Sequence, residues 1–153
     1  MNLVNRNNKL QCVNMEKDTL YKIAKACAFV IFADGKIEQS EINAAKALFE
    51  KYNLDSVEGE KIVKQHLDSF IDASDDPKEE ADYDLSDLET EGFDSFEILK
   101  DLALLIVADN EITYQEVDII HMLCKAFGLD AIFSSLAILN ALKDKDSISI
   151  NLE

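Results

Sequence analysis

Apolar residues recur along the chain at the three- and four-residue spacing of helices that bury one face. In the first half this spacing holds for Leu20, Ile23, Cys27, Val30 and Ile31 and, after a polar break, for Ile42, Ala45, Leu48, Phe49 and Tyr52. In the second half it returns at Phe96, Leu99, Leu102, Ala103 and Ile106 and, after another break, at Val117, Ile120, Leu123, Cys124 and Phe127. A further amphipathic helix is predicted behind each pair, from Glu58 to Ile71 and from Ala131 to Leu142.

The two halves are copies of one unit. When the sequence is shifted by 75 residues, Ala28 to Asp55 aligns with Ala103 to Asp130 without a gap, and nine of the 28 pairs are identical. The identical pairs are Ala28/Ala103, Ile31/Ile106, Ala33/Ala108, Asp34/Asp109, Ile37/Ile112, Glu41/Glu116, Leu48/Leu123, Leu54/Leu129 and Asp55/Asp130. Two copies of this length predict a duplicated half-domain folded about a pseudo-two-fold axis. Because Phe29 to Ala33 and Leu104 to Ala108 are apolar on every side, both leading helices are expected to be buried all round.

Composition supports one all-helical domain. Glycine (4) and proline (1) are scarce, which disfavours turn-rich sheets, and 153 residues with 48% hydrophobic content are enough for a single core. We predict an all-α, single-domain helical bundle over residues 16–145, with repeat one at 19–71, an acidic connector at 72–94 and repeat two at 95–142. Residues 1–15 are expected to form an N-terminal arm and residues 146–153 a C-terminal tail.

Negative charge is concentrated in the connector. The net charge is -16, and residues 72–94 hold eleven acids against Lys78 alone, which gives -10. Such a surface repels phosphate and anionic lipid, so we expect no nucleic-acid or membrane partner and instead expect cations or a basic protein surface. Two interpretations of the connector stay open, a solvated linker and an acidic docking segment. The apolar runs are too short to span a bilayer and no signal peptide is evident, so a cytoplasmic location is expected.

Both loops between the paired helices carry the pattern Ala-Asp-(Gly/Asn)-x-Ile-x-x-x-Glu. Gly35 and Asn110 readily adopt positive φ, so we expect a left-handed turn at each. The pattern resembles the back half of an EF-hand loop. The front ligand positions of the first loop would be Val30 and Phe32, which cannot coordinate calcium, and an isolated EF-hand is therefore excluded.

Loop carboxylates are the candidate metal ligands. They are Asp34, Glu41, Asp109 and Glu116, with Glu38 or Glu111 as outer candidates. If the pseudo-two-fold axis brings the loops together, these oxygens suit a hard divalent cation such as Ca²⁺, Mg²⁺ or Mn²⁺.

A purely structural role for the same acids is equally open. Thr113-x-x-Glu116 is a capping box and Glu38-x-x-Glu41 a weaker imitation, so each glutamate can satisfy amides at the start of its second helix. The loop aspartates can likewise bond to their own loop amides.

Two such loops, about 75 residues apart between apolar helices, resemble the TerB-like (tellurite-resistance) domain family. The resemblance covers Thr19 to Leu142 and rests on Asp34, Gly35, Glu41, Asp109 and Glu116. It implies an all-helical duplicated fold, a cytoplasmic role in tellurite resistance or related stress responses, and acidic loop residues suspected of binding metal. It also implies a module found attached to other domains, including a J-domain co-chaperone. The sequence departs from the family pattern at Asn110, which replaces the second glycine, and in the long acidic connector.

The residue inventory favours a binding module over an enzyme. His66 lies on an apolar stripe, which is typical of a semi-buried core histidine. Asp118-x-x-His121 looks like half of a di-iron motif, but the other copy has Asn43-x-x-Lys46. The cysteines are odd in number and without a C-x-x-C pattern, and Cys27 and Cys124 are expected in the core. We therefore predict no catalytic residues, and either a cation-binding stress module or a protein-interaction adaptor with structural loop acids.

Overall fold

Helices account for most of the structure. The computed structural model describes residues 3–33, 35–72 and 94–151, with residues 3–16 and 72 described by their backbone alone. Within these ranges lie α1 (Leu3–Phe32), α2 (Gln39–Lys51), α3 (Ser56–Asp72), α4 (Ser95–Ile106), α5 (Tyr114–Ala126) and α6 (Ile132–Leu142). Two short strands, β1 (Glu111–Thr113) and β2 (Ser149–Asn151), pair in parallel. The predicted all-α class is confirmed. The short pair of parallel strands was not predicted from the sequence.

The backbone repeats with the same 75-residue offset as the sequence. Helices α2 and α5 are each 13 residues long and start 75 positions apart, at Gln39 and Tyr114. The left-handed residues also fall in two equivalent pairs, Gly35 (φ 77°) with Asn110 (φ 62°) and Asn53 (φ 58°) with Gly128 (φ 76°). Glycine and asparagine change places between the copies because both tolerate positive φ. The left-handed turns predicted at the two loops are therefore confirmed.

An aspartate lies just before each trailing helix, at equivalent positions in the two repeats. Asp55 accepts hydrogen bonds from the backbone amides of Val57 and Glu58 at the start of α3. Its repeat partner Asp130 accepts from the amide of Ile132 at the start of α6. Aspartate is favoured near the start of a helix because its carboxylate accepts hydrogen bonds from amides that have no partner within the helix. This local role accounts for the identity of the two aspartates in the repeat.

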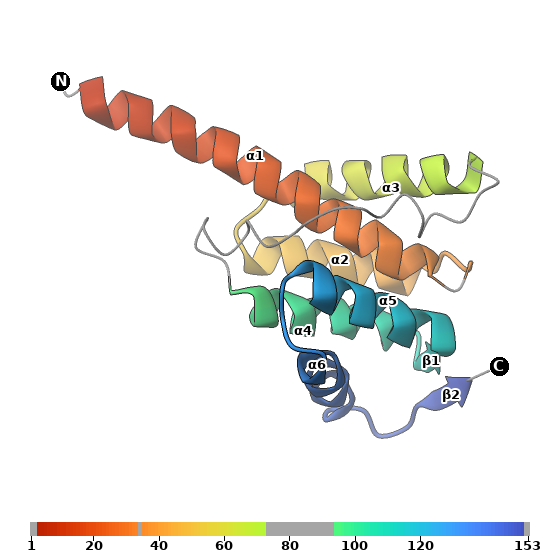
Figure 1. Ribbon diagram of the computed structural model, residues 1–153. Helices are drawn as coiled ribbons and strands as arrows, with labels where there is room; N and C mark the ends of the chain where they lie inside the picture. Colours follow the sequence, from red (N-terminus) through yellow and green to blue (C-terminus); the bar gives the residue numbers. More distant parts are fainter. Residues whose placement is uncertain (1–2, 34, 73–93, 152–153) are drawn as a thin grey trace.

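The two halves pack through their leading helices. Each copy forms its own three-helix unit, α1–α2–α3 and α4–α5–α6, and the units meet where α1 contacts α4 and α5 and where α4 contacts α1 and α2. Exchanging the copies turns the α1–α5 contact into the α4–α2 contact, which is the signature of a pseudo-two-fold arrangement. Helices α1 and α4 both run from left to right in Figure 1, so the loops that follow them, loop one (residues 33–38) and loop two (residues 108–113), lie at the same end of the molecule.

The leading helices form the centre of the core, but in the stretches expected to be buried all round Phe32, Ala33 and Ala108 are half-buried and Leu104 is exposed. Ile23, Ile31, Leu99 and Ile106 are buried, but Leu104 is 44% exposed, so the expectation of burial all round is wrong at this residue. The cause is a difference in length between the trailing helices. The residue equivalent to Leu104 is Phe29, whose ring lies 4.8 Å from that of Phe70 near the end of α3. Helix α6 ends at Leu142, five positions before the equivalent of the end of α3, so among the described residues Leu104 has no equivalent cover.

The outer face of α6 also differs from the predicted amphipathic pattern. Ile132, Leu136 and Leu139 are all strongly exposed. The equivalent positions in α3 are Val57, Lys61 and Lys64, so only the first copy places charges on this face.

Helix α1 and strand β2 extend into the segments that were predicted as the N-terminal arm and the C-terminal tail. Helix α1 begins at Leu3 and continues without a break into repeat one, and in Figure 1 its first part projects beyond the other helices. Residues 146–153, expected to form a tail, contain strand β2. Residues 73–93 of the acidic connector lie outside the described residues. The connector's two interpretations therefore stay predictions.

Candidate functional site at the acidic loops

In loop two, hydrogen bonds to acidic side chains stabilise the turn that leads into α5 and the start of that helix. The Glu111 amide donates a hydrogen bond to Asp109 Oδ1 at 3.0 Å, which closes a turn within the loop. The amide and hydroxyl of Thr113 both donate to Glu116 Oε1, at 3.0 and 3.1 Å, and the Glu116 amide donates back to Thr113 Oγ1 at 3.2 Å. The capping box predicted from the sequence is therefore present.

Loop one has the same backbone conformation just before its helix but a different cap. Glu38 and Thr113, which precede α2 and α5, both have extended backbones with φ near -106°. Glu38 makes no side-chain capping bond, so the imitation of a capping box suggested for Glu38 and Glu41 lacks its Glu38 half. Glu41 and Glu116 lie in the first turns of their helices and both are completely buried, at 0% exposure. Asp34 lies outside the described residues.

The donor set has the right chemistry for a hard cation, because all four candidate ligands are carboxylates. In the described part of the chain, no three His, Cys, Asp or Glu side chains converge closely enough to hold a metal ion. Asp34 is not part of this described set. Glu41, Asp109 and Glu116 thus do not form a complete site by themselves, and the role of the four acids in metal binding stays a proposal.

The C-terminal segment packs on loop two. This contact was not predicted from the sequence. Strand β2 pairs with β1 in the register Ile112 to Ile150. The Ser149 amide donates to the backbone oxygen of Asn110 at 2.9 Å, and Lys145 Nζ donates to the side-chain oxygen of Asn110 at 3.0 Å. Loop two therefore has a covering segment that pairs with its backbone.

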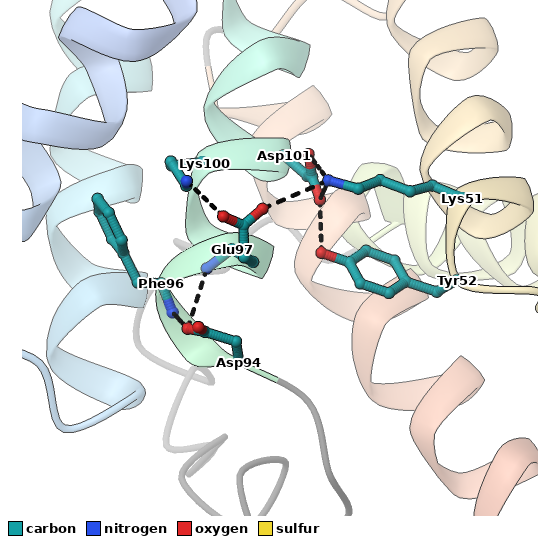
Figure 2. A network of polar contacts seen from close by, with 7 residues as sticks. All are labelled: Lys51, Tyr52, Asp94, Phe96, Glu97, Lys100 and Asp101. Atoms are coloured by element: carbon teal, nitrogen blue, oxygen red, sulfur yellow. Dashed lines mark hydrogen bonds and ion pairs between the residues drawn. The ribbon is translucent and has the colours of Figure 1, made fainter.

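A polar cluster joins the two repeats near the other end of α2, as Figure 2 shows. Asp101 of α4, whose side chain is 9% exposed, accepts hydrogen bonds from Lys51 Nζ at 2.9 and 3.0 Å and from the Tyr52 hydroxyl at 2.6 Å. Lys51 also forms an ion pair with Glu97 at 3.5 Å. Burial and the bond to Asp101 raise the pKa of Tyr52 far above its usual range, and the same carboxylate raises the pKa of Lys51.

The equivalent interface between α1 and α5 is apolar. The repeat partners of Lys51, Tyr52 and Asp101 are Ala126, Phe127 and Ala26. The sequence does contain an indication of this cluster. Asp101 lies between Ile98 and Leu105 with helical spacing, so an acidic residue interrupts the apolar stripe of α4. It was missed because its partners lie 49 and 50 residues away in the chain.

The remaining reactive side chains are packed as structural residues. Burial raises the pKa of the Cys27 thiol far above its usual range, with Asp101 adding to the effect, and burial also raises the pKa of Cys124. Both thiols are thus held in the protonated form, which is a poor nucleophile. His66 packs against Tyr21 and Phe70, with ring centroids 5.2 and 6.1 Å away. Its pKa is lowered first by burial and then by Lys25, as expected for a semi-buried core histidine.

Comparison with known families gives the same result as the duplicated loops. The TerB family, described as tellurite resistance protein TerB, matches residues 21–137. The chain belongs to the TerB family. The match spans both loops and lies inside the Thr19 to Leu142 range, so the resemblance found in the sequence is confirmed. No curated protein and no solved structure matches the chain significantly. Within the described ranges, no helix is long and apolar enough to cross a membrane.

Proposed function

We propose that this TerB-family chain is a non-catalytic module of a tellurite-resistance or related stress response, acting in the cytoplasm. Its two acidic loops together bind one divalent cation, Ca²⁺, Mg²⁺ or Mn²⁺. The ligands are Asp34 and Glu41 from the first copy and Asp109 and Glu116 from the second. The observation that carries this proposal is the complete burial of Glu41 and Glu116, at equivalent positions beside loops at the same end of the molecule.

Electrostatics favours a cation at such a place. Carboxylates are rarely fully buried, because removing the charge from water costs several kcal/mol per ion. A divalent cation between the loops offsets that cost for several carboxylates at once. The capping bonds of Asp109 and Glu116 are compatible with coordination, because each carboxylate has two oxygens and about four lone-pair sites. Since the ligands come from both copies, binding would tighten the contact between the two repeats.

The test replaces the buried glutamates with glutamine. Glu41→Gln with Glu116→Gln keeps the hydrogen-bonding shape that a capping box needs and removes the charge that a metal needs. The matched control, Glu58→Gln with Asp68→Asn, removes the same charge from two exposed positions of α3. In calorimetric titrations with each metal, wild type and control should bind equally, and the loop variant should bind at least about tenfold more weakly, a loss of about 1.4 kcal/mol.

A thermal scan gives an independent readout. Metal at about 100 times its dissociation constant should stabilise wild type by about 2.7 kcal/mol. The loop variant, with a melting temperature near wild type in EDTA, should show little shift. Equal binding of the metals by all three proteins would remove these glutamates from the proposal.

The second candidate function is a protein-interaction adaptor whose loop acids are structural. The bonds from Glu111 to Asp109 and from Thr113 to Glu116 favour it, because they give two of the four candidate ligands a local role. In this case a basic protein docks on the acidic surface that residues 72–94 dominate. The adaptor predicts no thermal shift with millimolar Ca²⁺, Mg²⁺ or Mn²⁺. It also predicts that deleting residues 78–91 abolishes recovery of a basic partner from lysate, and unchanged recovery would contradict the acidic docking surface.

A further inference from the structure

Gly35 and Glu38 of loop one have the backbone conformations of their repeat partners in loop two, but the two loops have different surroundings. Gly35 and Asn110 are left-handed at equivalent positions, and their amides donate equivalent hydrogen bonds, to Phe32 O at 2.9 Å and to Val107 O at 3.0 Å. Glu38 (φ -106°, ψ 139°) and Thr113 (φ -106°, ψ 160°) then continue in extended conformation. Any difference in exposure between the loops therefore comes from what covers them.

The chain's own C-terminal segment covers loop two. Strand β2 lies in parallel along β1, and the Ser149 amide donates to Asn110 O. Ile148, just before β2, packs against the core. Under this cover, Ile112 at the centre of β1 is only 3% exposed.

In the part of the chain that the structure describes, no such strand lies on loop one. Ile37, the repeat partner of Ile112, is 40% exposed, and every residue from 35 to 40 is exposed. The described ranges hold one two-stranded sheet, β1 with β2, so none of their segments adds a strand beside Ile37 and Glu38. Glu38 has an extended backbone and follows the exposed Ile37, and an open edge of this kind is one on which another chain can form strand hydrogen bonds.

We propose that residues 35–38 are a docking edge for an extended segment of a partner protein, which adds as a parallel strand in the way that β2 adds to β1. The partner's backbone amide donates to Gly35 O, the equivalent of the bond from Ser149 to Asn110, and an apolar side chain covers Ile37. The segment that covers loop two, Ser147 to Asn151, is a neutral stretch that alternates serine and isoleucine. We expect the partner segment on loop one to have the same chemistry. The proposal is independent of cation binding.

Two features define the partner further. Gly35 lacks the side-chain amide with which Asn110 binds Lys145, so the occupant of loop one has no need of a lysine at that position. A second copy of this chain is the weaker choice, because its β2 is already paired with its own β1 and a net charge of -16 on each copy opposes self-association.

The probe for the test is the chain's own covering segment, a synthetic peptide of residues 143–151, titrated into the isotope-labelled full chain. Saturable shifts of the backbone amide signals of residues 35–38 are expected. N-methylation of the peptide at Ser149 removes the pairing donor and should weaken binding at least about tenfold. The amide of Ile150 points to the opposite edge, because donors alternate along a strand. Methylation at Ile150 removes no hydrogen bond to loop one and should therefore change the affinity by less than about twofold.

Variants of the chain test the side-chain contact. Ile37→Asp should lose at least about tenfold in affinity, a change of about 1.4 kcal/mol, whereas Ile37→Val should bind like wild type. Val57→Asp, the same change at another exposed apolar residue of repeat one, is the matched control and should also bind like wild type.

Three results would overturn the proposal. They are the absence of saturable shifts at residues 35–38 with millimolar peptide, equal binding of the two methylated peptides, and shifts confined to residues 110–113, which would mean that the peptide only replaces β2. Shifts at residues 35–38 that depend on protein concentration without peptide would identify a second copy as the occupant and reject the partner protein.

Discussion

The polar cluster between α2 and α4 allows a quantitative prediction, because the equivalent interface between α1 and α5 is apolar and serves as a reference. Asp101→Ala removes the acceptor of Lys51 and Tyr52 and installs the residue found at the equivalent position, Ala26. The half-buried Tyr52 hydroxyl loses a charge-assisted hydrogen bond, which costs about 1.5–3 kcal/mol. Lys51 is 50% exposed, so solvent screening limits its contribution to about 0.5 kcal/mol. The expected loss is about 2–3.5 kcal/mol.

Removing every polar partner should restore much of this loss. Tyr52→Phe alone is expected to cost about 1.5–2 kcal/mol, because it leaves Asp101 buried with one bond fewer. In the triple variant Lys51→Ala, Tyr52→Phe, Asp101→Ala, the interface has the residues of its apolar counterpart. Replacing a buried polar set with apolar residues is often close to neutral, so the triple variant should lose only about 1 kcal/mol.

Urea and thermal unfolding of the five proteins, including Lys51→Ala, would measure these differences. For a domain of this size, about 2.5 kcal/mol corresponds to a fall in melting temperature of roughly 5–10 °C. The decisive quantity is non-additivity, with the triple variant more stable than the sum of the single changes predicts, by about 3 kcal/mol or more. Additive losses, or an Asp101→Ala variant within about 0.5 kcal/mol of wild type, would refute the account of this interface.

The cluster also gives a pH dependence with a definite sign. The folded-state pKa values of Tyr52 and Lys51 are both raised. Their stabilisation is complete below the unfolded-state values, about 10 and 10.4, and is lost as the pH rises above them. Wild type should therefore lose stability between about pH 9.5 and 11. The triple variant should lose less over that range, and parallel pH profiles for the two proteins would contradict the assignment.

Three further predictions test the packing. His66→Phe should flatten the fall in stability of wild type between pH 7 and 5.5, because a histidine with a lowered pKa stabilises above its unfolded value, about 6.5, and loses that effect as the pH falls; equal slopes in urea titrations would be inconsistent with this. Gly59→Ala should cost about 1–3 kcal/mol, since its Cβ would lie 2.5 Å from the Phe49 ring, and an unchanged melting temperature would show that the ring has room. Leu136→Lys with Leu139→Lys should leave stability within about 0.5 kcal/mol per site, because the equivalent face of α3 carries lysines; a larger loss in thermal unfolding would mean that this face is buried.

The sequence was most informative where local physics decides the structure. The repeat, the left-handed residues Gly35 and Asn110, and the capping box of Thr113 with Glu116 each depend on residues within a few positions of one another. Helix spacing located the core for the same reason, because burial on one face requires a regular apolar stripe.

Contacts between distant segments were not predictable in this way. The pairing of β2 with β1 depends on a segment that follows α6 and has no copy in repeat one. The bond from Lys51 to Asp101 joins residues 50 positions apart, and neither residue has a charged partner in the repeat alignment. The exposure of Leu104 depends on the length of α6, and the end of a helix is the least certain part of a sequence-based assignment.

The central functional claim is that both loops contribute ligands to one cation, and paramagnetic Mn²⁺ tests it most directly. One equivalent of Mn²⁺, added to the isotope-labelled chain, should broaden the backbone amide signals of Gly35 and Asn110 to the same extent. In the Glu41→Gln, Glu116→Gln variant, neither of these two signals should broaden. Broadening at only one of these residues, or confined to the acidic connector at residues 73–93, would contradict a shared site.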